Sequence, residues 1–147
     1  PMKILLKKIL EKVIIVFFVL IVIFGNILLI YNFKNKFKSI NEIYSFSTKI
    51  DEANYICIKD IDDNNIIDVS EEENREKLKK FFDNIRIRES KLKLIDKEQE
   101  IDYTIFIYLP ENEYFVNIKN SEIMINDKIY ETDIKIDSYL SEIFEDE

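Results

Sequence analysis

The stretch that decides the layout of this chain runs from Val13 to Tyr31 and reads VIIVFFVLIVIFGNILLIY. Only Gly25 and Asn26 interrupt an otherwise apolar run. About 19 residues of helix extend about 28 Å, which spans the hydrocarbon core of a bilayer. The sequence therefore predicts a transmembrane anchor over residues 13–33.

The residues on either side of this run indicate whether it is cleaved and how it is oriented in the membrane. The basic residues 1–12 precede it, as in a secretory signal peptide, but no small-x-small cleavage motif follows Phe24. We therefore expect an uncleaved, single-pass anchor in the cell membrane. Four lysines lie on each side of the run. Because a short basic tail resists translocation whereas a long domain crosses largely regardless of charge, we expect a cytoplasmic N-terminus and an extracytoplasmic C-terminal domain.

Asn26 is a polar residue in the interior of the predicted span. An amide in a membrane can hydrogen-bond to a second helix. We therefore consider Asn26 a candidate contact for a homo-oligomer or a helix partner, with a tolerated lone amide as the alternative.

Charge is divided unevenly along the chain. Residues 1–49 carry a net charge of +6 and residues 50–147 a net charge of −14, within the total of −8. A region this acidic is repelled by phosphate backbones, which argues against a nucleic-acid partner and favours a basic one.

The composition also excludes several kinds of active site. There is no histidine, one glycine (Gly25) and one cysteine (Cys57). The region after the anchor therefore lacks a Walker A loop, a dinucleotide-binding fingerprint and a nucleophile elbow, and the chain lacks the usual zinc ligands. Cys57 lies in an apolar run and is predicted to be a buried structural thiol. We expect no enzyme and no cofactor, although catalysis by paired carboxylates stays open.

An amphipathic pattern follows the anchor. Its members are Phe33, Phe37, Ile40 and Tyr44, at spacings of three and four residues. This period predicts that the helix continues as an amphipathic stalk over residues 34–49. We expect this stalk to pack on its own domain or on the membrane surface, with a short coiled coil as the alternative. One acidic α+β domain is then expected over residues 50–147.

Apolar runs separated by turn residues predict the sheet of this domain. We expect strands near residues 55–58, 66–69, 85–94 (an edge strand), 103–109, 114–118, 122–125 and 128–130. Ser70 and Glu73 form a capping-box pattern ahead of the stripe Leu78, Phe81, Phe82 and Ile85, and a last helix begins near Asp137. The pattern predicts an antiparallel sheet of about five to seven strands with two helices on one face.

One constellation of oxygen-bearing residues resembles an EF-hand calcium loop. Its members are Asp60, Asp62, Asn64, Ile66, Asp68 and Glu71, at the spacing of the loop's ligands. The match departs where Asn65 replaces the expected glycine, and a predicted strand stands where an entering helix belongs. A solvated hairpin turn is the alternative, so calcium binding stays open.

Tyrosines on the predicted strands are the candidates for a recognition surface. They are Tyr103, Tyr108, Tyr114 and Tyr130. If helices cover only one face of the sheet, aromatic side chains on the other face, surrounded by acids, can bind a protein. Packing within the sheet is the alternative.

The layout of basic tail, anchor, stalk and small α+β domain, with 18 lysines to three arginines, resembles that of short, uncharacterised, single-pass extracytoplasmic proteins of low-GC Gram-positive bacteria. The resemblance implies no functional residues. We expect a non-enzymatic binding module for a basic protein partner, in its most concrete version an immunity-type protein against a secreted toxin or bacteriocin. The alternative is an accessory or sensor subunit of a larger membrane complex that acts through the anchor and stalk.

Overall fold

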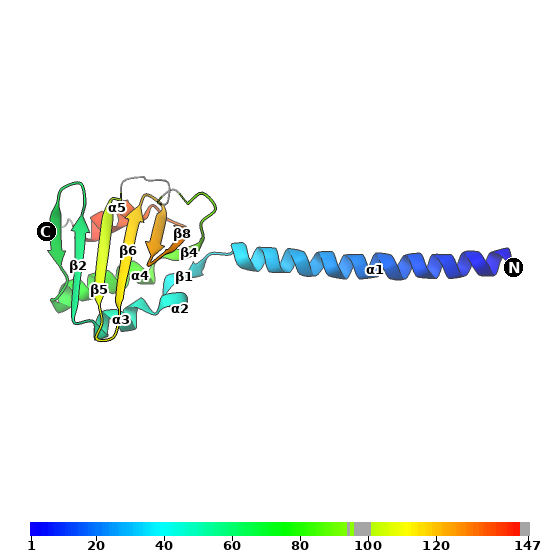
Figure 1. Cartoon of the computed structure of the whole chain (residues 1–147), viewed down its shortest axis with the longest axis horizontal. Coiled ribbons are helices and arrows are strands. Elements are labelled where there is room, and N and C mark those ends of the chain that lie inside the picture. The colour runs from blue at the N-terminus through cyan, green and yellow to red at the C-terminus, as the bar shows by residue number, and fades with distance from the viewer. Residues whose placement is uncertain (94, 96–100, 145–147) are drawn as a thin grey trace. The chain divides into compact units, whose positions relative to one another are not determined.

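The computed structural model describes residues 1–93, 95 and 101–144 and divides the chain into two compact units, Pro1–Lys36 and Phe37–Glu147. The first unit is the helix α1 (Met2–Asn35), drawn in blue to cyan in Figure 1. The helix is continuous because its interior contains no proline and a single glycine. Its segment Met2–Phe33 is long and apolar enough to cross a membrane.

The second unit combines short helices with strands. In chain order its elements are β1 (Lys38–Ser39), α2 (Ile40–Tyr44), α3 (Phe46–Glu52), β2 (Tyr55–Asp60), β3 (Asn65–Asp68), α4 (Glu72–Asp83), β4 (Arg86–Glu89), β5 (Tyr103–Tyr108), β6 (Glu113–Lys119), β7 (Glu122–Ile125), β8 (Lys128–Thr132) and α5 (Ile136–Phe144). The predicted α+β class is therefore confirmed.

Helix α1 does not continue as the predicted stalk over residues 34–49. Instead, residues from Phe37 onward belong to the compact second unit. Ile40, Phe46 and Ile50 are fully buried in its core. Of the residues whose spacing predicted a stalk, Ile40 and Tyr44 thus lie in the short helix α2 and pack in or against the core. The folded unit begins before the predicted boundary at residue 50.

The described residues form one eight-stranded sheet in the order β1-β4-β8-β7-β6-β5-β2-β3, with every neighbouring pair antiparallel. The count exceeds the predicted five to seven because β1 arises from the predicted stalk. β4 is shorter than the predicted strand 85–94 and is not an edge, since β1 pairs with its outer side. Leu94 of that predicted strand lies outside the described residues.

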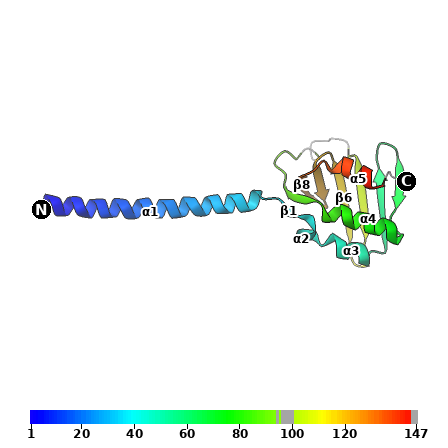
Figure 2. The same ribbon diagram turned by 180° about the vertical axis from the view of Figure 1, so that it is seen from behind.

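The helices α4 and α5 lie on one side of the sheet, as Figures 1 and 2 show from opposite directions. The predicted stripe of α4 faces this layer: Leu78, Phe81, Phe82 and the following Ile85 are all fully buried. Ile136 and Leu140 of α5 belong to the same core. The predicted pair of helices on one face is therefore observed, with α2 and α3 added to it.

Arg75 of α4 joins the two parts of the helical layer. Its guanidinium donates to the carbonyl oxygens of Ile50 at 2.6 Å, Ala53 at 3.1 Å and Ser70 at 3.2 Å. Ile50 and Ala53 lie at the end of α3, where the last carbonyls of a helix lack partners within it. Arg75 thus caps α3 from a neighbouring helix.

We expect Arg75→Ala to lower the free energy of unfolding by about 2–3 kcal/mol, because it removes charged hydrogen bonds and leaves carbonyl groups unpaired. Lys80→Ala, at an exposed position of the same helix, is the matched control and should change it by less than about 0.5 kcal/mol. Urea denaturation followed by far-UV circular dichroism measures both. Equal effects of the two substitutions would show that the capping contacts do not contribute.

Candidate functional site

The sheet face opposite the helices carries a continuous aromatic cluster. We call Tyr55, Phe106, Tyr108 and Phe115 the open-face patch. Tyr55 lies opposite Tyr108 and Phe106 opposite Phe115 in the strand register. Because directly opposed residues of antiparallel strands share a face, these side chains meet on one side of β2, β5 and β6.

The rings of the open-face patch touch in sequence. The ring centroids of Tyr55 and Tyr108 are 5.9 Å apart, those of Tyr108 and Phe106 6.4 Å, and those of Phe106 and Phe115 5.5 Å at an interplanar angle of 87°. Tyr55 is 41% exposed and Phe115 38% exposed. Ile66 of the adjacent edge strand β3 is 61% exposed. The described helices leave this face uncovered, so the patch presents apolar surface to solvent.

Three of the four predicted recognition tyrosines lie on the other face. Tyr103, Tyr114 and Tyr130 pack against the core beneath the helices. Tyr108 alone of the four belongs to the open-face patch. The face opposite the helices is therefore aromatic, but Tyr103, Tyr114 and Tyr130 do not lie on it, and recognition of a protein by this face stays a prediction.

Tyr130 has a structural partner. Its hydroxyl lies 2.6 Å from that of Tyr44 at the end of α2, and the two rings meet edge to face. Burial raises the pKa of Tyr44 well above its ordinary value, and the hydrogen bond to Tyr130 adds to the rise. This pair links α2 to β8.

Charged residues surround the open-face patch. Asp68 of β3 lies opposite Cys57, and Glu113 of β6 lies opposite Tyr108. Lys59 and Lys119 lie farther along the same faces of β2 and β6. The patch thus has acids at its border beside the most exposed rings.

Cys57 lies within this face, opposite both Asp68 and Phe106, and is half-buried, whereas a buried thiol was predicted. Burial raises the pKa of the Cys57 thiol, the negative charge of Asp68 also raises it, and a hydrogen bond from Tyr55 opposes the rise. The thiol is therefore protonated at neutral pH, which argues against a role as a nucleophile.

These contacts predict opposite effects of two substitutions on the alkylation of Cys57 by iodoacetamide at a fixed, mildly alkaline pH. Asp68→Asn should raise the rate because it lowers the thiol pKa. Tyr55→Phe should lower the rate because the thiolate loses a hydrogen bond. Glu111→Gln is the control for a change of net charge. Mass spectrometry of the full chain measures the rates, and equal rates in all four proteins would contradict the arrangement.

The predicted calcium residues are spread along a β-hairpin. Asp60 pairs with Asn65, whereas Asp68 pairs with Cys57 at the far end of the same ladder. The Asp60 carboxylate accepts hydrogen bonds from the backbone N–H groups of Asp62 and Asp63, at 3.1 and 3.3 Å. The hairpin alternative is thus the one that the backbone adopts.

Asp68, near the C-terminal end of the predicted calcium loop, also makes a local hydrogen bond. The Asp68 carboxylate accepts from the backbone N–H of Ser70 at 2.8 Å. Glu71 is the N-cap residue of α4 and makes no side-chain capping bond, so the predicted capping box at Ser70 is not formed. Among the described residues no group of three or more Asp, Glu or Cys side chains is placed to hold a metal ion.

Asn26 lies on the exposed surface of α1 between apolar neighbours. Its predicted contact with another helix stays a prediction.

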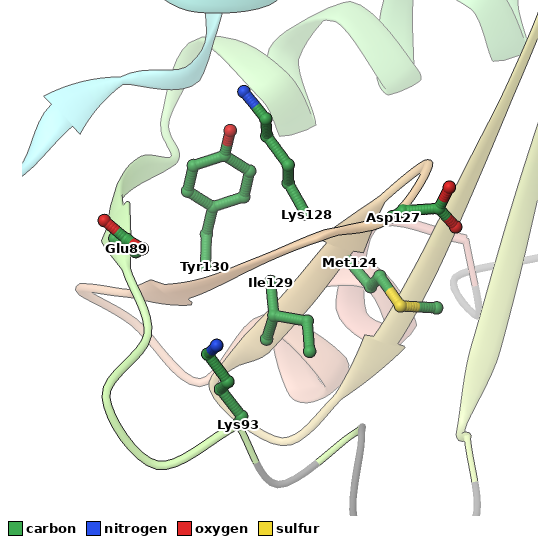
Figure 3. Close-up of a pocket in the computed structure, with 7 residues that line it drawn as sticks. All are labelled: Glu89, Lys93, Met124, Asp127, Lys128, Ile129 and Tyr130. Atoms are coloured by element: carbon green, nitrogen blue, oxygen red, sulfur yellow. The ribbon is translucent and has the colours of Figure 1, made fainter.

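A hollow of about 500 Å³ lies beside the start of β8 (Figure 3). Glu89 and Lys93 line one side of it, next to Ile129 of β8. Figure 3 shows that Tyr130 and Ile129 point to opposite sides of β8. The hollow therefore wraps around a strand and does not gather polar groups toward one point, unlike an active site.

No family model, curated protein or solved structure was found to match this chain.

Proposed function

We propose that this chain is a membrane-anchored, non-enzymatic binding module that captures a basic protein through the open-face patch. The observation that carries the proposal is the continuous exposed aromatic cluster on the sheet face that the described helices leave uncovered. Large exposed apolar patches bordered by polar residues are typical of protein-binding surfaces. Tyrosine and other aromatic residues are enriched in such interfaces.

Charge supports a basic partner. The chain after residue 49 has a net charge of −14, and Asp68 and Glu113 border the patch. Complementary charge accelerates association and loses its effect as salt screens it. An immunity-type protein, which intercepts a secreted basic toxin or bacteriocin at the cell surface, is the most concrete version of this function.

The membrane part of the proposal depends on α1. Its length and apolar composition support an anchor, and the tail of residues 1–12 supports a cytoplasmic N-terminus. A reporter enzyme that is active only outside the cytoplasm, fused to the C-terminus, tests this orientation. An inactive fusion to this reporter, together with an active fusion to a reporter that works only in the cytoplasm, would reverse the orientation.

Capture of the partner tests the function itself. The full chain, solubilised with its membrane and crosslinked, should recover one basic protein in an amount that falls steeply as salt is raised before crosslinking. Recovery that does not depend on salt, or recovery of acidic proteins only, would contradict the proposal.

Asn26 favours a second candidate function, in which the chain is an accessory subunit of a membrane complex. Replacement of residues 13–33 by an unrelated apolar helix separates the two, since a binding module keeps its function and such a subunit loses it. The buried positions of Ile40 and Phe46 remove the predicted stalk from this alternative.

A further inference from the structure

The hairpin β2–β3 forms one end of the sheet and has a free edge. β3 pairs with β2 and has no strand on its other side among the described residues. The backbone N–H of Val69 donates to the carbonyl of Ile56 at 2.9 Å. Hydrogen-bonded and non-hydrogen-bonded residues alternate along an antiparallel pair. The backbone N–H and C=O groups of Ile67 and Asn65 therefore also point toward β2, whereas those of Ile66 and Asp68 point away from it.

The outward-pointing backbone groups of Ile66 and Asp68 differ in their hydrogen bonds. The Asp68 carbonyl accepts a hydrogen bond from the Asn74 side chain at 3.2 Å. The N–H and C=O of Ile66 and the N–H of Asp68 remain directed away from the sheet. This edge can therefore pair with a short extended segment, as in recognition by strand addition.

A cleft adjoins β3 on the helix side of the sheet. It consists of two neighbouring cavities of about 310 and 330 Å³ that share Asp60, Asp63, Tyr103 and Ser141. Ile58 and Ile67 of the hairpin and Leu140 and Phe144 of α5 supply its apolar lining.

The rim of this cleft is acidic. Asp62, Asp102 and Asp137 join Asp60 and Asp63 around it. Lys119 pairs with Asp102 at 3.1 Å, and within the described part of the chain the other four carboxylates form no ion pair. An apolar floor under an acidic rim fits the aliphatic stem and cationic head of arginine or lysine.

The two sides of β3 therefore favour different side chains. Ile67 faces the cleft, whereas Ile66 lies 61% exposed on the side of the open-face patch. Side chains of an added strand alternate between these sides. A second copy of this chain is a poor occupant, because the same acids would face one another across the edge.

We propose that the partner binds as an extended segment that pairs with β3, with basic side chains at alternate positions directed into the acidic cleft and apolar side chains between them beside Ile66. This inference rests on the proposed function and specifies how part of the partner is recognised. It identifies the partner's segment by its alternation of basic and apolar residues.

The test uses the full chain in zwitterionic detergent micelles and a short acetylated peptide that alternates arginine and valine. Amide NMR should show saturable binding, with shifts at Ile66, Ile67 and Asp68. N-methylation of the peptide amides that face β3 should weaken binding about tenfold, because backbone hydrogen bonds are lost while the charge is kept. Replacement of arginine by citrulline, which removes the charge and keeps the shape, should weaken it similarly.

The N-methyl groups are on the peptide and the protein is unchanged, so weaker binding cannot result from unfolding of the protein. The inference is overturned if the alternating peptide does not bind, or if the N-methylated peptide binds equally well, as it would through general charge attraction. The proposed function fails separately, if the native partner is captured equally well after the open-face patch is disrupted. Loss of capture on that disruption, together with no effect of N-methylation, would retain the function and reject strand pairing.

Discussion

A fragment of residues 37–147 should fold, whereas a fragment of residues 50–147 should be unfolded in the absence of denaturant. The shorter fragment follows the domain boundary that the sequence pattern predicts. It lacks Ile40 and Phe46, which are fully buried. Loss of one large core side chain costs about 2–5 kcal/mol, and a domain of this size has about 5–15 kcal/mol of stability.

The comparison needs an intermediate variant and a suitable probe. Phe46→Ala in the longer fragment should lower the free energy of unfolding by about 3–5 kcal/mol without abolishing the fold. The chain has no tryptophan, so far-UV circular dichroism and tyrosine fluorescence are the probes for urea denaturation. A cooperative unfolding transition of the 50–147 fragment, equal to that of 37–147, would contradict the placement of α2 and α3 in the core.

The second large effect concerns the open-face patch. The double substitution of Tyr55 and Phe115 by lysine should weaken partner binding by about a thousandfold, since each aromatic side chain at the centre of an interface contributes about 2 kcal/mol or more. Lysine also opposes a basic partner by like charge. Both positions are more than a third exposed, so the fold should tolerate the change.

A matched control keeps the change of charge and moves it off the patch. Ile43 and Leu92 are 45% and 60% exposed and lie in α2 and in the loop after β4. Their double substitution by lysine should weaken binding only by the added charge. The dissociation constant of the recovered partner, measured by interferometry on the full-length chain, decides the comparison. Equal weakening by both pairs would show that net charge alone governs binding.

Much of the fold follows from local patterns. The predicted strand 122–125 has the same bounds as β7, and the stripe from Leu78 to Ile85 faces the core as expected. These segments have a clear period and clear turn residues at their ends. Residues 37–52 lack such clear signals, because their apolar spacing is compatible with one long helix as well as with two short ones. Only tertiary packing decides between them.

Only part of the open-face patch could be predicted from the sequence. Tyr114 shares its face with Val116 and Ile118, whereas Phe115 shares its face with Asn117 and Lys119. This alternation would have assigned Tyr114 to the core and Phe115 to the open face. The alternation along one strand could not place Tyr55 in the patch. Its position beside Tyr108 depends on the pairing of β2 with β5, which are far apart in sequence.

The predicted calcium loop has the residue spacing of an EF-hand loop but does not adopt its structure. The strand-forming residues on both sides of the turn impose an extended hairpin instead. On this geometry we expect millimolar calcium to leave the melting temperature of the chain unchanged. A rise that Glu71→Gln abolishes would show that the loop rearranges around the ion.

Site-specific photo-crosslinking in the membrane tests the central claim most directly. A photoreactive amino acid is placed at Phe115 on the open face or at Lys80 on α4, in the full-length chain, and the crosslinked proteins are identified by mass spectrometry. We predict that one basic protein is crosslinked from position 115 and not from position 80. The same protein crosslinked from position 80, with none from position 115, would contradict binding through the open-face patch.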